Sequence, residues 1–173
     1  MGEEVETLED LLRPGLRAVC VGINPSPVSV NAGHYYQGRA GQRFFARLRE
    51  AGVLPDAARG HEDDAAFGVG IGFTDIIKRA SANAKGLPAS EHTHGRELLL
   101  AKLDTYRPQF VIFTFKKTAQ VVFGAFDGNG FVPGLRLAAS EVFVMPGTYE
   151  SATTVATTMR ALAERFVGPA VSR

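Results

Sequence analysis

The sequence predicts one α/β domain, a three-layer α/β/α sandwich around a central, mainly parallel sheet of about four to five strands. The chain has 173 residues, 45% of them hydrophobic, which suits one sizeable core and leaves little room for a second domain. Short apolar runs alternate with longer amphipathic stretches, as strands and helices do in such folds. A helix that ends at Pro108 and returns at once as an apolar strand indicates a crossover between parallel strands.

The N-terminal half is predicted to supply the first strand, the best-defined amphipathic helix and a long loop. Residues 1–6 form an acidic stretch that we expect to be flexible. Glycine and proline mark most of the element boundaries that follow. The predicted elements are a short helix over 7–12, a buried strand over 17–22, an ordered loop over 24–38, a helix over 42–51 capped by Gly52, a surface excursion over 55–66 and an apolar, glycine-punctuated segment over 67–77.

The C-terminal half alternates regularly between predicted helices and strands. Ser90 is a suitable N-cap for a long helix. The predicted elements are a loop over 81–88, a helix from 90 to 106, a strand over 109–115, a helix over 116–124, short strands over 135–137 and 141–145, and a closing helix over 152–166. In such sheets ligands bind beyond the carboxyl ends of the strands, so the turns after Gly22, Phe115 and Met145 are where chemistry is expected.

Charge and cysteine content indicate the cellular compartment of the protein but do not identify its binding partner. The 19 Lys and Arg against 18 Asp and Glu give a net charge of +1, which neither requires nor excludes a polyanion. Seven arginines fall within residues 13–59, so one face is expected to be locally basic. The single cysteine, Cys20, excludes an internal disulfide and predicts a reducing compartment. With no apolar run of membrane-spanning length and no signal-peptide pattern, we expect a cytoplasmic protein, associated with the nucleoid if the source is prokaryotic.

Several motifs occur in a fixed order along the chain. Gly22-Ile23-Asn24-Pro25 follows the first strand, and Gly33-His34-Tyr35-Tyr36 and Arg43-Phe44-Phe45 come after it. Together they resemble the first active-site motif of the mismatch-specific uracil/thymine DNA glycosylases, the G:T/U family of the uracil DNA glycosylase superfamily. Residues 72–79 resemble that family's Gly-Phe/Val-Thr block, and residues 144–150 stand where its second motif belongs. The resemblance runs in order over residues 8–166.

The resemblance implies a monofunctional DNA glycosylase that hydrolyses the N-glycosidic bond of a flipped-out base. Asn24 would hold the attacking water through its side-chain carbonyl, unless it only caps the turn, a frequent role of asparagine. Asp75 departs from the family, whose better-known members carry Asn or Lys there. Burial would raise its pKa and make it the second catalytic candidate. An N-cap, or an ion pair with Lys78 or Arg79, would explain Asp75 equally well.

The resemblance also implies a base pocket and a DNA-contacting loop. Tyr36 matches the stacking aromatic, although core packing is the more usual role of such rings. Tyr149 is placed to plug the duplex as a wedge. Arg43 and Arg47 lie one helical turn apart and would contact phosphates, or form a solvated helix face. The pocket candidates are Gly22, Ile23, Pro25, His34, Tyr35 and Tyr36, and the DNA-binding candidates are Met145, Pro146, Gly147, Thr148, Tyr149, Ser151, Arg43 and Arg47.

No metal or other cofactor is expected. His92-x-His94 lacks further ligands at suitable spacing, and one cysteine cannot hold an iron-sulfur cluster. The expected partner is double-stranded DNA with a mismatched or damaged base, or single-stranded DNA, and not a membrane. The main alternative is a non-catalytic nucleotide- or DNA-binding module on the same fold. A serine hydrolase using Ser26 or Ser29 is disfavoured because no G-x-S-x-G elbow is present.

Overall fold

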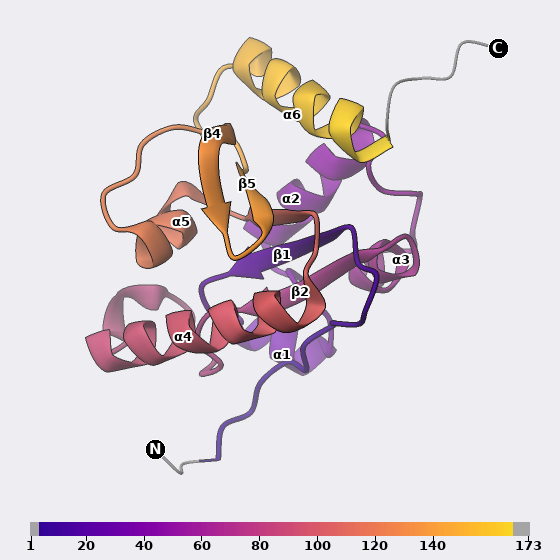
Figure 1. Cartoon of the computed structure of the whole chain (residues 1–173). Helices are drawn as coiled ribbons and strands as arrows, with labels where there is room; N and C mark the ends of the chain where they lie inside the picture. Colours follow the sequence, from indigo (N-terminus) through magenta and orange to yellow (C-terminus); the bar gives the residue numbers. More distant parts are fainter. Residues whose placement is uncertain (1–3, 168–173) are drawn as a thin grey trace, which may run out of the picture.

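The computed structural model describes residues 4–167 and contains one five-stranded sheet (Figure 1). Its strands lie in the order β2-β1-β3-β5-β4. The first four in that order are parallel, and β4 pairs with β5 in the antiparallel sense at one edge. The strands are β1 (Ala18–Gly22), β2 (Ile71–Asp75), β3 (Phe110–Phe113), β4 (Gly130–Leu137) and β5 (Ser140–Val144).

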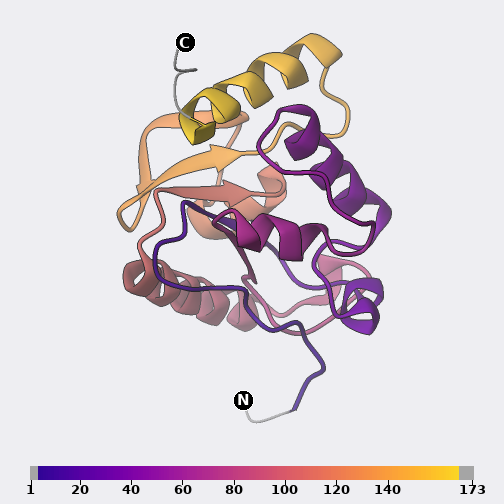
Figure 2. The ribbon, with the colours of Figure 1, turned by 90° about the vertical axis from the view of Figure 1, so that its right-hand side faces the viewer.

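Helices cover both faces of the sheet, which confirms the predicted three-layer α/β/α class. Buried side chains from α2, α3 and α6 pack on one face, and those from α4 and α5 pack on the other. Figure 2 shows α6 above the sheet and α4 below it. The helices are α1 (Pro27–Ala32), α2 (Arg39–Glu50), α3 (Glu62–Gly68), α4 (Ala89–Tyr106), α5 (Lys116–Phe123) and α6 (Ala152–Val167), with a 3₁₀ turn at Ala84–Gly86.

Strand β1 shows why a nearly continuous apolar run forms the centre of this sheet. All five of its residues are buried. Successive side chains of a strand point to opposite faces. Ala18 and Cys20 join the core beneath α2 and α6, whereas Val19 and Val21 join the core beneath α4. A strand covered by helices on both sides has no polar face, so it lacks the alternation of a half-exposed strand.

Three predicted segments differ from the structure. Residues 7–12 form no helix: Leu11 instead makes an antiparallel bridge with Phe73, with N–O distances of 3.0 Å in both directions. So short a segment gains little from helical hydrogen bonds, whereas pairing with β2 satisfies its backbone. The predicted loop over 24–38 contains α1, which starts from the Ser26 cap and Pro27. The predicted surface excursion over 55–66 runs into α3, where Glu62 and Asp63 are buried.

Smaller corrections concern the helix starts and the N-terminus. Helix α2 begins at Arg39, three residues before the predicted start. Helix α4 takes Pro88 as its N-cap, so Ser90 lies inside its first turn and is not the cap. Of the predicted flexible stretch, residues 1–3 lie outside the described residues, and residues 4–6 are exposed. Among the described helices, none is long and apolar enough to cross a bilayer.

Candidate active site

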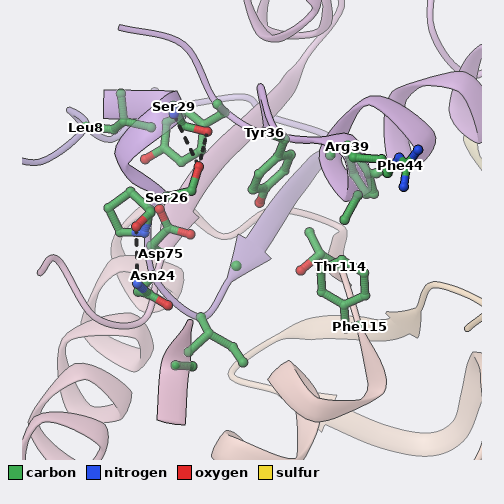
Figure 3. Close-up of a pocket in the computed structure, with 18 residues that line it drawn as sticks. Leu8, Asn24, Ser26, Ser29, Tyr36, Arg39, Phe44, Asp75, Thr114 and Phe115 are labelled. Atoms are coloured by element: carbon green, nitrogen blue, oxygen red, sulfur yellow. Dashed lines mark hydrogen bonds between the residues drawn. The ribbon is translucent and has the colours of Figure 1, made fainter. Parts of the chain in front are cut away.

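A pocket of about 320 Å³ opens at the carboxyl ends of β1, β2 and β3. This is the edge at which ligands bind in open α/β sheets. The pocket brings together residues that the sequence places about 50 positions apart (Figure 3). Of the predicted catalytic and pocket residues, it is lined by Gly22, Ile23, Asn24, Pro25, Tyr35, Tyr36 and Asp75.

Asp75 is the most unusual side chain of the pocket. It is 2% exposed, and neither of its carboxylate oxygens has a hydrogen-bond partner among the described residues. Burial raises the pKa of Asp75 to about 7; the Lys78 and Lys102 charges oppose this rise and Asp10 adds to it. The ion pair with Lys78 that the sequence left open does not form, because Lys78 binds Asp10. A carboxylate with this pKa exchanges a proton readily near neutrality.

The side chains of Asp75 and Tyr36 can both pack against position 22 because that residue is glycine. Gly22 pairs with Asp75 in the register of β1 and β2. A Cβ atom at position 22 would lie 2.2 Å from Asp75 Oδ1 and 3.3 Å from Tyr36 Cε1. Any side chain there would therefore displace the carboxyl group, and glycine is required by this close approach.

A polar network beside the edge strand β2 surrounds Asp10. Asp10 binds Lys78, and its Oδ2 lies 2.6 Å from Lys102 Nζ. Thr74 Oγ1 donates to Asp10 Oδ1 at 2.7 Å. Burial alone would raise the pKa of Asp10. The hydrogen bonds from Lys102 and Lys78 outweigh this effect, so the pKa of Asp10 lies below its usual value. Both lysines thus pair with Asp10, and neither forms an ion pair with Asp75, although their charges still lower its pKa.

Asn24 is held by its side-chain nitrogen. Nδ2 lies 2.9 Å from Ser81 Oγ, 3.1 Å from the Pro25 carbonyl oxygen and 3.3 Å from the carbonyl oxygens of Arg79 and Ser81. All four are oxygen atoms, which identifies this end of the amide as the donor. Among the described residues, Oδ1 accepts no hydrogen bond. Asn24 therefore fastens its turn through the nitrogen, and its carbonyl oxygen remains available as an acceptor at the pocket.

The two tyrosines form the aromatic wall of the pocket. Tyr36 adopts a left-handed backbone conformation with φ of 58°, which is uncommon for a bulky residue. Its ring contacts Phe44 with a centroid distance of 5.1 Å, and Tyr35 stacks on Phe73 at 5.4 Å. Both phenolic oxygens are buried without partners among the described residues. Burial and the nearby Asp75 raise the pKa of each phenol, so both stay neutral.

A comparison with protein families agrees with this geometry. The family model of the uracil DNA glycosylase superfamily matches residues 9–163.

The chain belongs to the uracil DNA glycosylase superfamily.

Members of this superfamily are DNA glycosylases, hydrolases that act on DNA containing uracil. The match includes every strand of the sheet and every residue of the pocket except Leu8. The pocket at the carboxyl ends of the strands therefore lies within the part of the chain that matches the superfamily.

One predicted pocket residue lies elsewhere in this glycosylase fold. His34 does not line the pocket: its Nδ1 lies 2.9 Å from Oδ1 of the buried Asp63. Asp63 Oδ2 also accepts the backbone N–H of Tyr35 at 2.7 Å. The imidazole is turned toward α3 because a buried carboxylate there needs donors. The prediction for His34 is thus corrected.

A second hollow of about 230 Å³ adjoins the pocket and contains several predicted DNA-binding residues of this superfamily member. Arg43 is exposed at its edge. Arg47 instead donates to the carbonyl oxygens of Pro146 and Gly147, the latter at 3.1 Å. It therefore braces the loop after β5 from within, a role that the sequence did not suggest.

The loop from 145 to 151 is divided between buried and exposed residues. Met145 is 2% exposed, so its side chain belongs to the core, whereas Tyr149 is fully exposed. Glu150 Oε1 accepts a hydrogen bond from Asn129 Nδ2 at 3.2 Å. Ser151 Oγ accepts the backbone N–H of Thr154 at 3.1 Å and caps α6. The side chains of Met145 and Ser151 are thus engaged within the protein, and Tyr149 is the most accessible of the predicted contacts.

Other residues of the glycosylase pocket were not predicted. Thr114 and Phe115 reach it from the end of β3, next to the turn after Phe115 that the strand-end rule had indicated; neither was predicted as a site residue. Ser26 is the N-cap of α1 and Ser29 lies within that helix, whose Ser-Pro start is a typical cap signal in a segment that was predicted to be a loop. The lining residues that sequence reasoning missed are Leu8, Ser26, Ser29, Gly38, Arg39, Ala40, Gly41, Phe44, Ala84, Thr114 and Phe115.

Proposed function

We propose that this protein is a monofunctional DNA glycosylase that removes uracil, and as further substrates thymine or other damaged bases, from mismatched DNA. The observation that carries the proposal is the partnerless, buried carboxylate of Asp75 in the same pocket as Asn24. Leaving a buried carboxylate without partners costs stability, and such costs are concentrated at functional sites. The order of motifs and the family match support DNA as the substrate.

In the proposed reaction, Asn24 Oδ1 accepts a hydrogen bond from the attacking water and Asp75 takes its proton. The oxygen of the water forms a bond to C1′ of the flipped nucleotide as the bond from C1′ to the base nitrogen breaks. The base leaves with that electron pair and takes up the proton that Asp75 accepted from the water, directly or through solvent, which restores the ionised carboxylate. The reacting sugar is cationic, so the ionised carboxylate also stabilises it electrostatically. Neither role requires a covalent intermediate.

The aromatic wall gives the flipped base its stacking surface. Tyr36 lines the pocket beside the Asp75 carboxyl group. A base that leaves the duplex loses its stacked neighbours, and an aromatic ring replaces part of that energy. The backbone amides near Ile23 and Tyr36 are our candidates for reading the base edge. Tyr149 is the candidate wedge, which would fill the gap in a mismatched duplex.

The test is single-turnover excision by the full chain on oligonucleotides of one sequence. Uracil is placed opposite guanine, opposite adenine and in a single strand, with thymine opposite guanine as a fourth substrate. We expect the fastest release from the G:U duplex. Asp75→Asn and Asn24→Ala should each lower the rate on the order of 10²-fold, whereas Asp104→Asn, an exposed aspartate on α4, should not.

The outcomes separate the parts of the proposal. An unchanged rate in Asp75→Asn with a lost rate in Asn24→Ala would show that the amide acts alone. Faster release from a single strand than from the G:U duplex would contradict the mismatch preference. Tight duplex binding without release of any base would favour the non-catalytic DNA-binding module.

A further inference from the structure

Three polar side chains meet on the outer side of the turn that carries the tyrosines. His34 follows α1, His61 precedes α3, and Asp64 lies in the first turn of α3. Each offers one ligand atom within 4.8 Å of the other two. His61 and Asp64 are about 60% exposed, and His34 is 22% exposed. The group is accessible from solvent and lies apart from the lining of the base pocket.

We propose that His34, His61 and Asp64 form a binding site for a divalent transition-metal cation, and that zinc fits it best. Two imidazoles and one carboxylate are a donor set that Zn²⁺ uses in proteins, and three protein ligands leave a position for water. Imidazole donors favour zinc, nickel and copper, whereas magnesium and calcium prefer sites built from oxygen alone.

The distances between the ligand atoms suit such a centre. His61 Nδ1 lies 3.1 Å and His34 Nδ1 lies 3.7 Å from Asp64 Oδ2. Ligand atoms of a tetrahedral zinc with bonds of about 2.0 Å are roughly 3.3 Å apart. All three ligand atoms lie within 4.8 Å of one another, and we expect small rotations of the exposed His61 and Asp64 side chains to bring them to the tetrahedral spacing.

Asp63 connects the cation site to the rest of the fold. Its Oδ1 lies 2.9 Å from His34 Nδ1, and its Oδ2 accepts the Tyr35 backbone N–H. Binding of a cation at His34 Nδ1 breaks the hydrogen bond to Asp63, and the neutral ring then carries its single proton on Nε2. Asp63 Oδ1 then becomes a neighbouring oxygen of the metal. The bound cation would link α3 to the turn before Tyr35, and it takes no part in the proposed hydrolysis.

The experiment is calorimetric titration of ZnCl₂ into the full chain after treatment with a chelator. We expect one cation per chain, binding of NiCl₂ at the same site and no measurable heat with MgCl₂. The double variant His61→Asn/Asp64→Asn should weaken zinc binding at least about tenfold. Because both residues are exposed, this variant should fold, and circular dichroism checks that it does. His61→Gln alone serves as a second, milder variant.

The chain provides a matched control. It has four histidines, and the two outside the cluster, His92 and His94, lie near the start of α4. The variant His92→Asn/His94→Asn should bind zinc as the parent does. Zinc binding that persists in His61→Asn/Asp64→Asn, or that disappears in His92→Asn/His94→Asn, would overturn the proposal. Excision assays are not needed, so this test is independent of the proposed glycosylase activity.

Discussion

The strand-end pocket and the loop from 145 to 151 differ in how their side chains are held. At the strand ends, Asp75 is buried with both oxygens unpaired, and it lies over the bare Cα of Gly22. In the loop, Tyr149 projects fully into solvent, while Arg47 bonds to the carbonyl oxygens beneath it. The pocket is therefore arranged before any ligand arrives, whereas the Tyr149 side chain packs against no other residue that the structure describes.

This difference assigns separate tasks to the two regions. Preorganised charge and a desolvated acid serve bond breaking, because they act without reorganisation during the reaction. An exposed aromatic side chain on a braced loop serves contact with a partner, because its apolar surface is covered only when the partner binds. Variants in the pocket should alter chemistry and stability together. Variants at the loop tip should alter binding alone.

The largest expected effect concerns the stability contributed by position 75. Burial raises the Asp75 pKa to about 7 from 3.8, so the folded state holds a proton that the unfolded chain has lost between those values. Stability therefore falls as pH rises through this range. Asp75→Asn removes the penalty and should raise the free energy of unfolding by up to about 4 kcal/mol at pH 8, but by only about 1 kcal/mol at pH 4.5. Urea unfolding at the two pH values measures this, and an equal change at both would contradict the raised pKa.

The next effect concerns Gly22. In Gly22→Ala the added Cβ would meet Asp75 Oδ1 at 2.2 Å, so the carboxyl group must move. A displacement of this size should lower uracil excision about 10²-fold. Single-turnover rates measure the loss. Gly68→Ala is the matched control, since Gly68 does not line the pocket and a Cβ there meets nothing within 4 Å. Full activity in Gly22→Ala would mean that the position of Asp75 is not critical.

The third effect compares two arginines on one helix. Arg47→Ala removes the hydrogen bonds to Pro146 and Gly147 and should lower the free energy of unfolding by about 2 kcal/mol. Arg43→Ala, at an exposed position, should change it by less than about 0.5 kcal/mol but should reduce the salt dependence of DNA binding. Thermal unfolding and salt titrations of binding distinguish the two variants. Equal free energies of unfolding for the two variants would show that Arg47 does not stabilise the loop.

The smallest effect is expected at the loop tip. Tyr149→Ala should leave stability unchanged, because the side chain is fully exposed. If Tyr149 is the wedge, Tyr149→Ala should lower the rate of excision from a duplex by about tenfold or less. The rate on a single strand should change little, because a single strand has no gap to fill. Comparing the two substrates tests this, and equal losses on both would exclude the wedge.

The sequence predicted the layers of the fold better than its contacts. Periodicity and boundary residues define strands such as β1 locally, so their existence was predicted correctly. The segment at residues 7–12 was misread because its structure depends on the bridge between Leu11 and Phe73, which are remote in sequence. Periodicity carries no information about such pairing.

The motifs named several residues that the structure brings together, whereas their roles remain predictions. Asn24, Tyr36 and Asp75 come together in one pocket. His34 was misplaced because its direction is decided by Asp63, whose burial follows from the packing of α3 and has no signal in the sequence. Arg47 was expected at the DNA backbone for the same reason, since only the fold shows the carbonyl oxygens beside it. Neighbours from distant segments determine where a polar side chain turns.

The close approach of Gly22 to Asp75 predicts that these two positions change together during evolution. A side chain at position 22 would overlap the Asp75 carboxyl group, so a substitution at one position restricts which residues fit at the other. A relative with a shorter side chain at position 75 gains room for alanine at position 22, whereas a relative with aspartate there does not. Substitutions at these two positions are therefore expected to be correlated between lineages. A pair of alignment columns, one at the end of each strand, would then record which lineages retained a carboxylate at this place.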